Sequence, residues 1–273
     1  MHAWIDGELL AEPEAGVISV TDHGFTVGDG VFEAVKVVEG RPFALDLHLQ
    51  RLVRSATGLG LDAPDLDVVR RGVAAVLAEQ HLPLGRLRIT LTAGPAPLGS
   101  GRGSHAPTLV VVAVPMGPSP ATTSVVTVPW PRNEHSAIAG LKTTSYAENV
   151  VALAHAHQHD ATEAIFANTA GHLCEGTGSN VFYVVDGELR TPTLASGCLA
   201  GVTRGLVLEW CGAREVDEPI AVAQEADEVF LVSTTRDVQP VTRWGARELR
   251  VGSITRAAAD TWRTREPEHL FPV

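Results

Sequence analysis

Strand-like and helix-like patterns alternate irregularly along the chain, and this order limits the folds open to it. The β-rich runs include 31–38, 86–92 and 108–114, and helical spacing of apolar residues follows Asp46 and Asp65. A regular strand-helix-strand rhythm would predict a doubly wound parallel sheet, and the chain lacks that rhythm. We therefore expect a mixed α/β (α+β) fold in which hairpins and helices alternate.

Turn dipeptides and capping residues set the expected ends of these elements. Asp-Gly pairs at 6–7 and 186–187 are typical of hairpin turns, and Glu39-Gly40 is expected to end a strand. Asp46 is expected to be a helix N-cap, and helical spacing repeats after Asp65. Further strands are expected near 124–128, 163–167, 180–185, 188–191, 214–217 and 228–232, and further helices near 145–159, 202–210 and 254–265.

A proline-rich stretch near the middle of the chain marks the expected domain boundary. With 273 residues the chain is long enough for one large or two smaller domains. Residues 115–123 contain three prolines, a glycine and small polar residues, which is typical of a linker. We expect a small N-terminal α/β domain over 1–115, an interdomain linker over 116–123 and a large C-terminal α/β domain over 124–273.

Charge, apolar runs and cysteines argue against several classes of protein. The formal net charge is −11 and the arginines are scattered among carboxylates, which argues against a nucleic-acid partner. Residues 1–20 lack the cationic start and apolar run of a signal peptide, and the longest apolar run, 109–114, is too short to span a membrane. The three cysteines have no C-x-x-C spacing. We expect buried thiols, no metal and a cytoplasmic location.

Lysine is rare, which leaves few amines for catalysis. Of 21 Lys and Arg residues, only Lys36 and Lys142 are lysine. Lys142 precedes a predicted helix and has small hydroxyl residues beside it. A lysine among apolar neighbours loses the hydration that favours its ammonium form, so its pKa falls and it becomes a usable nucleophile or base. The same pattern also fits a solvated surface lysine, so the residues alone leave both interpretations open.

Three other stretches combine small or hydroxyl residues with the end of a predicted element. At 197–204 small residues lead into a helix, where free N–H groups and the Thr203 hydroxyl suit a phosphate, and a simple capped helix start is the alternative. Residues 233–235 offer hydroxyls at a strand end. Glu175 opens a glycine-rich turn without G-x-G-x-x-G spacing, so this turn is not a nucleotide-binding motif.

These stretches occur in an order that resembles the class IV (fold type IV) pyridoxal-phosphate (PLP) aminotransferases. The resemblance covers nearly the whole chain and is carried by segments 18–33, 48–52, 142–149, 175–182, 197–204 and 233–235. It implies two α/β domains with the active site between them, PLP as cofactor, an amino donor and a 2-oxo acid as substrates, and a homodimer. Enzymes like D-amino-acid transaminase are closest in motif, and aminodeoxychorismate lyase is a close relative.

The resemblance also assigns roles to residues. Lys142 would form the Schiff base with PLP and then move a proton between substrate and cofactor. Glu175 would face the pyridine nitrogen and keep it protonated, and Arg51 would bind the phosphate. The implied cofactor contacts are Arg51, Lys142, Tyr146, Glu175, Ser179, Asn180, Leu199, Gly201, Val202, Thr203, Thr234 and Thr235. The implied substrate contacts are Phe32, Ala34, Lys36, Arg102 and His105.

One strand and one loop bear on the choice of substrate. A period of two puts Phe32, Ala34 and Lys36 on one strand face, which looks into the substrate pocket in this family, although Lys36 near the strand end could instead reach solvent. The strand is similar to that of the D-amino-acid enzymes. Those enzymes bind the substrate α-carboxylate with an Arg-x-His pair, for which this chain offers the more widely spaced Arg102 and His105.

The expected reaction is PLP-dependent transfer of an amino group from a D-amino acid, an (R)-primary amine or both to a 2-oxo acid such as pyruvate. If neither Arg102 nor His105 reaches the pocket, carboxylate-free (R)-amines become suitable substrates. Two alternatives stay open, 4-amino-4-deoxychorismate lysis with release of pyruvate and transamination of branched-chain L-amino acids, since a shared fold does not choose among activities. The combined presence of Lys142, Glu175 and Arg51 argues against a non-catalytic protein of this fold.

Overall fold

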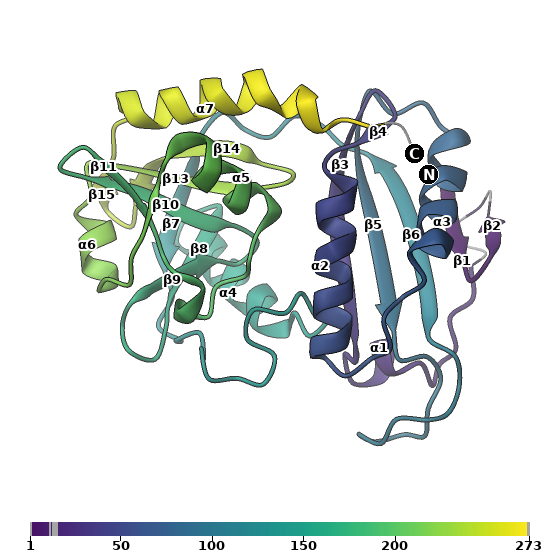
Figure 1. Cartoon of the computed structure of the whole chain (residues 1–273). Helices are drawn as coiled ribbons and strands as arrows, with labels where there is room; N and C mark the ends of the chain where they lie inside the picture. The colour runs from purple at the N-terminus through teal and green to yellow at the C-terminus, as the bar shows by residue number, and fades with distance from the viewer. Residues whose placement is uncertain (1, 11, 13–15, 272–273) are drawn as a thin grey trace. The chain divides into compact units, whose positions relative to one another are not determined.

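A computed structural model describes residues 2–10, 12 and 16–271 of the chain. The chain divides into two compact units, each with its own sheet and helices (Figure 1). Unit 1 comprises Met1–Pro118, Leu141–Tyr146 and Glu268–Val273, and unit 2 comprises Ser119–Gly140 and Ala147–Pro267. Both units mix helices with strands, which confirms the predicted α/β (α+β) fold class.

Unit 1 contains an antiparallel sheet with the strand order β2-β1-β6-β5-β3-β4. Its long strands β3 (Gly30–Val38) and β5 (Leu84–Thr92) pair along their whole length. The other elements of this unit are β1 (His2–Ile5), β2 (Glu8–Leu10), α1 (His23–Thr26), β4 (Arg41–Pro42), α2 (Leu45–Gly58), α3 (Leu66–Ala78) and β6 (Thr108–Pro115).

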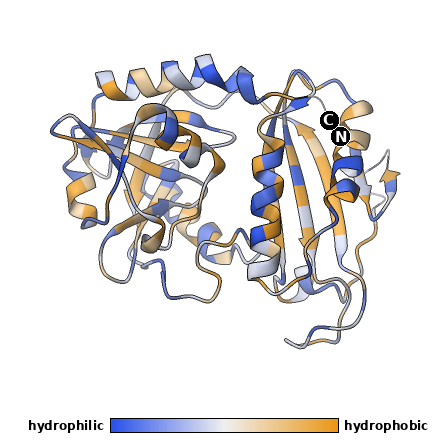
Figure 2. Cartoon of the chain, viewed as in Figure 1, coloured by the Kyte–Doolittle hydropathy of each residue, from blue (hydrophilic) through white to orange (hydrophobic). Residues whose placement is uncertain are grey.

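Helices α2 and α3 pack on one face of this sheet and enclose the core of unit 1. Helix α2 contacts β3, and α3 contacts β1 and β6. Figure 2 shows hydrophobic residues along β5 and β6, which these helices help to cover. Leu49 and Leu52 of α2 and Val69 and Val73 of α3 are completely buried in this core. Removal of their apolar surface from water is the main force that holds the helices on the sheet.

The two faces of β3 follow the predicted period of two. Val31, Val35 and Val37 are completely buried in the core of unit 1. Successive side chains of a strand point to opposite faces, so the other face of β3 carries the set predicted from the sequence, Phe32, Ala34 and Lys36.

Local turn chemistry confirms one predicted hairpin and accounts for the start of α3. The β1–β2 hairpin turns at Asp6-Gly7, and both residues have the positive φ angles that such a turn requires, 47° and 110°. Asp65, after which helical spacing repeats in the sequence, is the N-cap of α3, and its carboxylate accepts hydrogen bonds from the N–H groups of Asp67 and Val68.

The prediction that Asp46 is a helix N-cap was wrong. Helix α2 begins at Leu45, and Ala44 occupies the N-cap position with a φ of 47°. The N–H of Ala44 donates to the carbonyl of His269 at 2.8 Å, so a contact with the far end of the chain fixes this turn. Asp46 lies in the first helical turn instead, where its negative charge interacts favourably with the positive end of the helix dipole.

The segment Leu141–Tyr146 belongs to unit 1, although it follows the predicted linker. The N–H of Phe32 donates to the carbonyl of Lys142 at 3.0 Å, and the N–H of Thr144 donates to the carbonyl of Gly30 at 2.8 Å. The segment therefore pairs with the start of β3. The predicted boundary instead assigns Leu141–Tyr146 to the C-terminal domain over 124–273. The sequence could not show this pairing, because so short a segment has no periodic pattern.

Unit 2 contains a mixed sheet with the strand order β12-β11-β10-β13-β14-β7-β8-β9, and β15 pairs with β14. The pairs β7–β8, β7–β14 and β11–β12 are parallel, and the others are antiparallel. Its elements are β7 (Thr123–Thr127), α4 (Ala147–Gln158), β8 (Glu163–Ala167), β9 (Leu173–Gly176), β10 (Asn180–Val185), β11 (Glu188–Thr191), η2 (Leu194–Ser196), α5 (Val202–Cys211), β12 (Arg214–Glu215), α6 (Ile220–Gln224), β13 (Glu228–Ser233), β14 (Asp237–Trp244), β15 (Arg247–Glu248) and α7 (Ser253–Arg265). A last short helix, η3 (Glu266–His269), leads from unit 2 back into unit 1.

Helices cover the central strands of the unit 2 sheet. Helix α5 packs on β13, α7 packs on β13 and β14, α4 packs on β8, and α6 contacts β9 and β10. The rings of Phe182 on β10 and Phe230 on β13 stack with their centroids 5.2 Å apart. Cys174 and Cys198 are buried free thiols, as expected, whereas Cys211 is half-buried. The pKa of Cys198 rises to about 11 because burial disfavours the thiolate.

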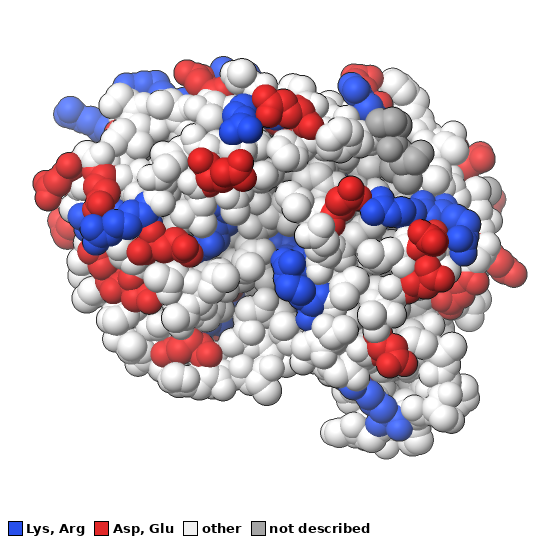
Figure 3. Space-filling model, in the orientation of Figure 1, with Lys and Arg blue, Asp and Glu red and all other residues white. Residues whose placement is uncertain are grey.

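The charged side chains do not gather by sign on the face drawn in Figure 3. Lys and Arg side chains lie among Asp and Glu side chains on this face, with wide uncharged areas between them. Among the described residues, no helix is long and apolar enough to cross a membrane.

We expect the substitution Asp65→Ala to lower the free energy of unfolding by about 1 kcal/mol, because the first N–H groups of α3 lose their acceptor. Urea denaturation of the full chain measures this change. Asp62→Ala is the matched control, since Asp62 is exposed in the same loop, and we expect a change of less than about 0.5 kcal/mol. Equal losses in the two variants would contradict the capping role.

Candidate active site

Lys142 is held by backbone contacts to two elements of unit 1. Its carbonyl accepts from the N–H of Phe32 on β3, and its own N–H donates to Ser55 Oγ on α2 at 3.1 Å. Its half-buried side chain lies over two aromatic rings, with Nζ 4.5 Å from the centroid of Phe32 and 5.8 Å from that of Tyr146. Lys142 is therefore a fixed amine on the Phe32 face of the sheet rather than a solvated surface lysine.

The small hydroxyl residues beside Lys142 hold this segment against the loop before β3. Thr144 Oγ1 and Ser145 Oγ donate to the carbonyl of Gly28 at 2.9 and 3.0 Å. Gly28 has a φ of 71°, and a Cβ atom there would lie 2.7 Å from Ser145 Oγ. Only glycine fits this position without strain, so the loop fixes where Lys142 stands.

The Phe32 face of the sheet carries a cation that sequence reasoning missed. The guanidinium carbon of the exposed Arg88 lies 3.9 Å from the centroid of the Phe32 ring, and the Phe32 and Tyr146 rings meet edge to face at 5.2 Å. Arg88 lies opposite Ala34 in the β3–β5 pairing. The period of two along 86–92 was available from the sequence, but only the pairing of β3 with β5 brings Arg88 beside Phe32.

Lys36 lies on the same sheet face, opposite Arg86. The Lys36 side chain is buried, so it does not extend freely into solvent. The alternative that Lys36 only reaches solvent is therefore not supported. Lys36 and Arg88 thus lie on one sheet face, and Arg88 and Lys142 contact the Phe32 ring there.

The other face of β3 buries a carboxylate with two basic partners from α2. Arg51 donates from Nε to Glu33 Oε1 at 2.8 Å and from Nη2 to Glu33 Oε2 at 2.6 Å. His48 Nδ1 lies 2.7 Å from Glu33 Oε2. Burial raises the pKa of the Glu33 carboxyl, but the charge and hydrogen bonds of Arg51 and His48 outweigh it and lower this pKa to about 2. Glu33 is thus a buried carboxylate ion.

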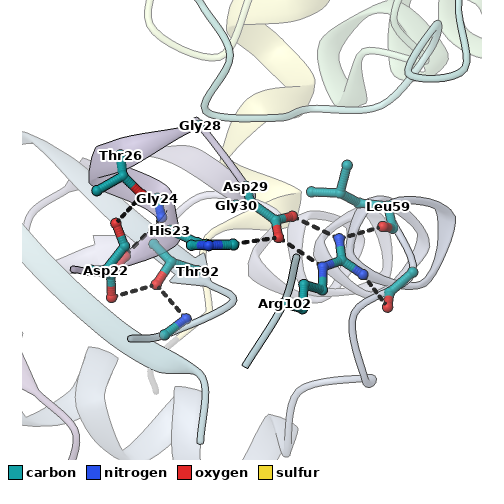
Figure 4. A network of polar contacts seen from close by, with 12 residues as sticks. Asp22, His23, Gly24, Thr26, Gly28, Asp29, Gly30, Leu59, Thr92 and Arg102 are labelled. Atoms are coloured by element: carbon teal, nitrogen blue, oxygen red, sulfur yellow. Dashed lines mark hydrogen bonds and ion pairs between the residues drawn. The ribbon is translucent and has the colours of Figure 1, made fainter. Parts of the chain in front are cut away.

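Arg102 has a different set of partners from the one predicted for it. Its Nε and Nη2 donate to the two carboxylate oxygens of Asp29 at 2.7 and 2.6 Å, and it also donates to the carbonyls of Leu59 and Gly60 after α2 (Figure 4). The hydrogen bond with Asp29 raises the pKa of Arg102. These contacts fasten the loop after β5 to the end of α2, so they do not support a role for Arg102 in binding a substrate carboxylate.

Asp22 holds the two ends of the same loop, the last residue of β5 and the first residue of β6. Its Oδ2 atom accepts a hydrogen bond from the hydroxyl of Thr92 at 2.9 Å, and its Oδ1 accepts from the N–H of Gly24 (Figure 4). The hydroxyl of Thr108 also donates to Oδ2 at 2.8 Å. His105, the second predicted carboxylate contact, is exposed in this loop. Its role stays a prediction.

In unit 2, Glu175 is anchored through Leu199. Glu175 Oε2 accepts a hydrogen bond from the N–H of Leu199 at 2.9 Å, and Asn180 Nδ2 donates to the carbonyl of Leu199 at 2.9 Å. Arg132 Nε lies 3.6 Å from Glu175 Oε1, and its other nitrogens bond the side chains of Glu148 and Asn149. The structure therefore brings together three predicted cofactor residues and adds Arg132, a cation that no sequence pattern had indicated.

The start of α5 has the character of an anion site. Gly201 occupies the N-cap position and has no side chain to cap the helix, so Val202 and Thr203 open the first turn with free N–H groups. Thr203 Oγ1 is buried and makes no hydrogen bond within the described part of the chain. A Cβ atom at Gly201 would lie 2.1 Å from Asn180 Oδ1, so glycine is required here.

A second buried carboxylate, Glu163, organises the turn that carries Ser179. Ser179 Oγ donates to Glu163 Oε2 at 3.3 Å, and Arg236 Nη2 contacts the same oxygen at 2.9 Å. Arg236 follows Thr234 and Thr235, the predicted phosphate contacts in the turn between β13 and β14. Thr234 is buried, and the carbonyl of Thr235 accepts from Ser119 Oγ.

These groups fit the chemistry of PLP. Lys142 supplies an amine, Glu175 supplies an acceptor for a pyridinium N–H, and the uncapped start of α5 with the unpaired Thr203 hydroxyl suits a phosphate.

Comparison with known proteins identifies the family. A family model for class IV aminotransferases matches residues 30–244. The chain belongs to the class IV aminotransferase family. It is 31% identical to a D-alanine aminotransferase of Staphylococcus epidermidis, with 93% of each chain covered.

Two solved structures of aminotransferases resemble the whole chain. The branched-chain aminotransferase of Thermoproteus uzoniensis with norvaline is 28% identical, with a TM-score of 0.92 and coverage of 100% of this chain and 99% of that one. A hypothetical aminotransferase of Mycobacterium tuberculosis in PLP-bound form is 28% identical, with a TM-score of 0.86 and coverage of 98% and 99%. The chain is therefore a PLP-dependent class IV aminotransferase, and the resemblance inferred from its motifs is confirmed.

We expect Lys142→Ala to abolish covalent attachment of PLP, because the variant lacks the amine. Borohydride reduction followed by peptide mass spectrometry measures the attachment. Lys36→Ala, which removes the other lysine, is the control and keeps the modified peptide around residue 142. Attachment at Lys36 in the wild-type protein or in Lys142→Ala would contradict the assignment of Lys142.

Proposed function

We propose that this aminotransferase transfers the amino group of a D-amino acid to a 2-oxo acid such as pyruvate. The observation that carries the proposal is the placement of two basic side chains, Arg88 and Lys142, against the Phe32 ring of unit 1. A substrate that bears a carboxylate gains from a guanidinium fork beside the amine, whereas a simple (R)-amine does not. The similarity of strand 31–37 to that of the D-amino-acid enzymes supports the D stereochemistry.

The proposal gives each element of the site a task. Bound PLP supplies the electron sink that transamination requires. Lys142 attaches the cofactor and moves the proton of the substrate α-carbon. Glu175, held by Leu199, keeps the pyridine nitrogen protonated. Arg51, the start of α5 and Thr234 bind the phosphate, with Tyr146, Ser179, Asn180 and Thr235 as further cofactor contacts.

In this proposal Arg88 binds the substrate carboxylate, the role that the family resemblance had implied for Arg102. Because Arg102 is engaged by Asp29, Leu59 and Gly60, the substrate carboxylate needs another partner. Arg88 is exposed and shares a sheet face with Phe32, Ala34 and Lys36, which form the wall of the substrate site in this proposal.

A branched-chain L-amino acid is the second candidate donor. The fit to the Thermoproteus uzoniensis enzyme over the whole chain favours it. The basic side chains against the Phe32 ring would bind the carboxylate of either donor, so the two proposals differ in the stereochemistry and size of the substrate side chain.

A panel of donors tests the proposed function. With 2-oxoglutarate as acceptor, we expect fast transfer from D-alanine, slow transfer from (R)-1-phenylethylamine and none from L-leucine. Chromatography of the amino acid products measures the transfer. Transfer from L-leucine but not from D-alanine supports the branched-chain candidate, and release of pyruvate from aminodeoxychorismate supports the lyase alternative.

We expect Arg88→Met to raise KM for D-alanine about tenfold to a hundredfold, because a charge-assisted hydrogen bond to the carboxylate is lost. The rate with the carboxylate-free amine should change less than threefold, on the order of the scatter of a surface substitution. Arg86→Met is the matched control, since it removes the same charge from the same sheet face two residue pairs further along. Equal effects of the two variants on KM would contradict the role of Arg88.

The proposal includes a homodimer in the cytoplasm. Several apolar residues of unit 1 are more than three-quarters exposed, and Val20, Phe25 and Leu98 lie on two segments that the Asp22–Pro95 backbone bridge joins. A second copy of the chain would remove this apolar cluster from water.

We expect Phe25→Glu to shift the protein from dimer to monomer in sedimentation velocity, because a charge would be buried in the contact. Leu194→Glu, at an exposed apolar residue of unit 2, is the control and should leave the dimer intact. A dimer that persists in Phe25→Glu at all concentrations would remove this surface from the interface.

A further inference from the structure

Glu33 stands where the sheet otherwise buries valine. It shares the inner face of β3 with Val31 and Val35, and like them it is completely buried. Burial of a carboxylate costs far more than burial of a valine unless the charge is paired and hydrogen-bonded. The arrangement of its partners therefore indicates what the carboxylate does.

The partners of Glu33 come from one stripe of helix α2. His48, Arg51 and Ser55 recur at helical spacing and are all buried. Arg51 meets Glu33 through two parallel hydrogen bonds of 2.8 and 2.6 Å, and Ser55 accepts the N–H of Lys142 at 3.1 Å. The same helix face thus holds the guanidinium of Arg51 and the backbone of Lys142.

His48 completes the support as a neutral donor. Burial lowers the pKa of His48, and the charges of Arg51 and Lys142 lower it further, against the opposite effect of Glu33. A carboxylate ion can only accept hydrogen bonds, so the 2.7 Å contact with Glu33 Oε2 requires the proton of the neutral ring on Nδ1. His48 thereby fixes one oxygen of Glu33 without adding a second positive charge.

The contact between Glu33 and Arg51 also fixes the direction of the guanidinium. The two hydrogen bonds use Nε and Nη2, which form one edge of the planar group. The plane and the position of Nη1 are then set, with Nη1 pointing away from Glu33. An arginine held in this way loses little side-chain entropy when an anion binds, so binding is stronger.

We propose that Glu33 is a positioning residue that orients Arg51 toward the phosphate of the cofactor, with His48 as its support. This inference rests on the proposed phosphate contact of Arg51. It adds a residue that is expected to touch no part of cofactor or substrate, yet determines how tightly the phosphate is bound.

Two effects of Glu33 on phosphate binding have opposite signs. Its negative charge repels a phosphate through space, so loss of the charge alone would tighten binding. Its hydrogen bonds orient Arg51, so loss of the fork would weaken binding. The proposal requires that orientation outweighs repulsion, which gives the experiment a definite sign.

The experiment compares PLP with pyridoxal, which lacks the phosphate. Full-length protein freed of its cofactor is titrated with each compound, and absorbance gives both Kd values. For Glu33→Gln we expect the Kd of PLP to rise about tenfold to a hundredfold, the effect of losing one charged hydrogen bond. We expect the Kd of pyridoxal to change less than about twofold.

Further variants separate orientation from charge and from general loss of stability. Glu33→Asp keeps the charge but shortens the side chain, so it should weaken PLP binding in the same way if orientation is the cause. Asp29→Asn is the matched control, because it breaks another arginine-carboxylate fork of unit 1, that of Arg102, and should leave the ratio of the two Kd values unchanged. Thermal unfolding of each variant shows that it is folded at the titration temperature.

The outcomes distinguish this inference from the proposal on which it rests. If Arg51→Met leaves the PLP to pyridoxal ratio at the wild-type value, Arg51 does not bind the phosphate and the proposed function loses that contact. If Arg51→Met lowers the preference for PLP but Glu33→Gln and Glu33→Asp do not, the positioning role of Glu33 is overturned. Tighter binding of PLP by Glu33→Gln also overturns it, because repulsion then outweighs orientation.

Discussion

The arrangement of unit 1 depends on one constraint, that successive side chains of strand β3 point to opposite faces of the sheet. One face packs against α2 and contains Glu33, which engages Arg51 and His48. The other face carries Phe32, over which the Lys142 side chain lies. A slip of one residue in the β3–β5 pairing would exchange the two faces. It would put a phenyl ring against α2 and expose the carboxylate, so the register of one strand fixes both sets of residues.

Helix α2 holds polar groups of unit 1 in fixed positions. Its buried leucines anchor it to the sheet, and its polar stripe uses that anchorage to hold Arg51 and, through Ser55, the backbone of Lys142. A side chain mounted on a packed helix keeps its position better than one on a loop. The positions of Arg51 and Lys142 in unit 1 thus follow from ordinary core packing.

Much of the fold and the family could be predicted from the sequence, because periodic patterns and motif order are local signals. The β1–β2 hairpin, the faces of β3 and the mixed α/β class are examples. The start of α2 was misplaced because a contact of Ala44 with His269 decides it, and no local pattern reports a partner so far along the chain. Arg88 was missed for the same reason, since its place beside Phe32 comes from strand pairing. Arg102 looked like a binding residue by type, and only the structure shows its carboxylate and carbonyl partners.

Through the contacts of Arg102, the loop after β5 also stabilises the C-terminal end of α2. The Arg102 guanidinium donates to the carbonyls of Leu59 and Gly60, the two residues that follow the last residue of α2. The loop is therefore a helix cap delivered from 42 residues away along the chain. In evolutionary terms, changes in this loop act on the end of the helix that carries Arg51 and Ser55. Substitutions in this loop therefore change the free energy of unfolding at the C-terminal end of α2 before they change a contact with cofactor or substrate.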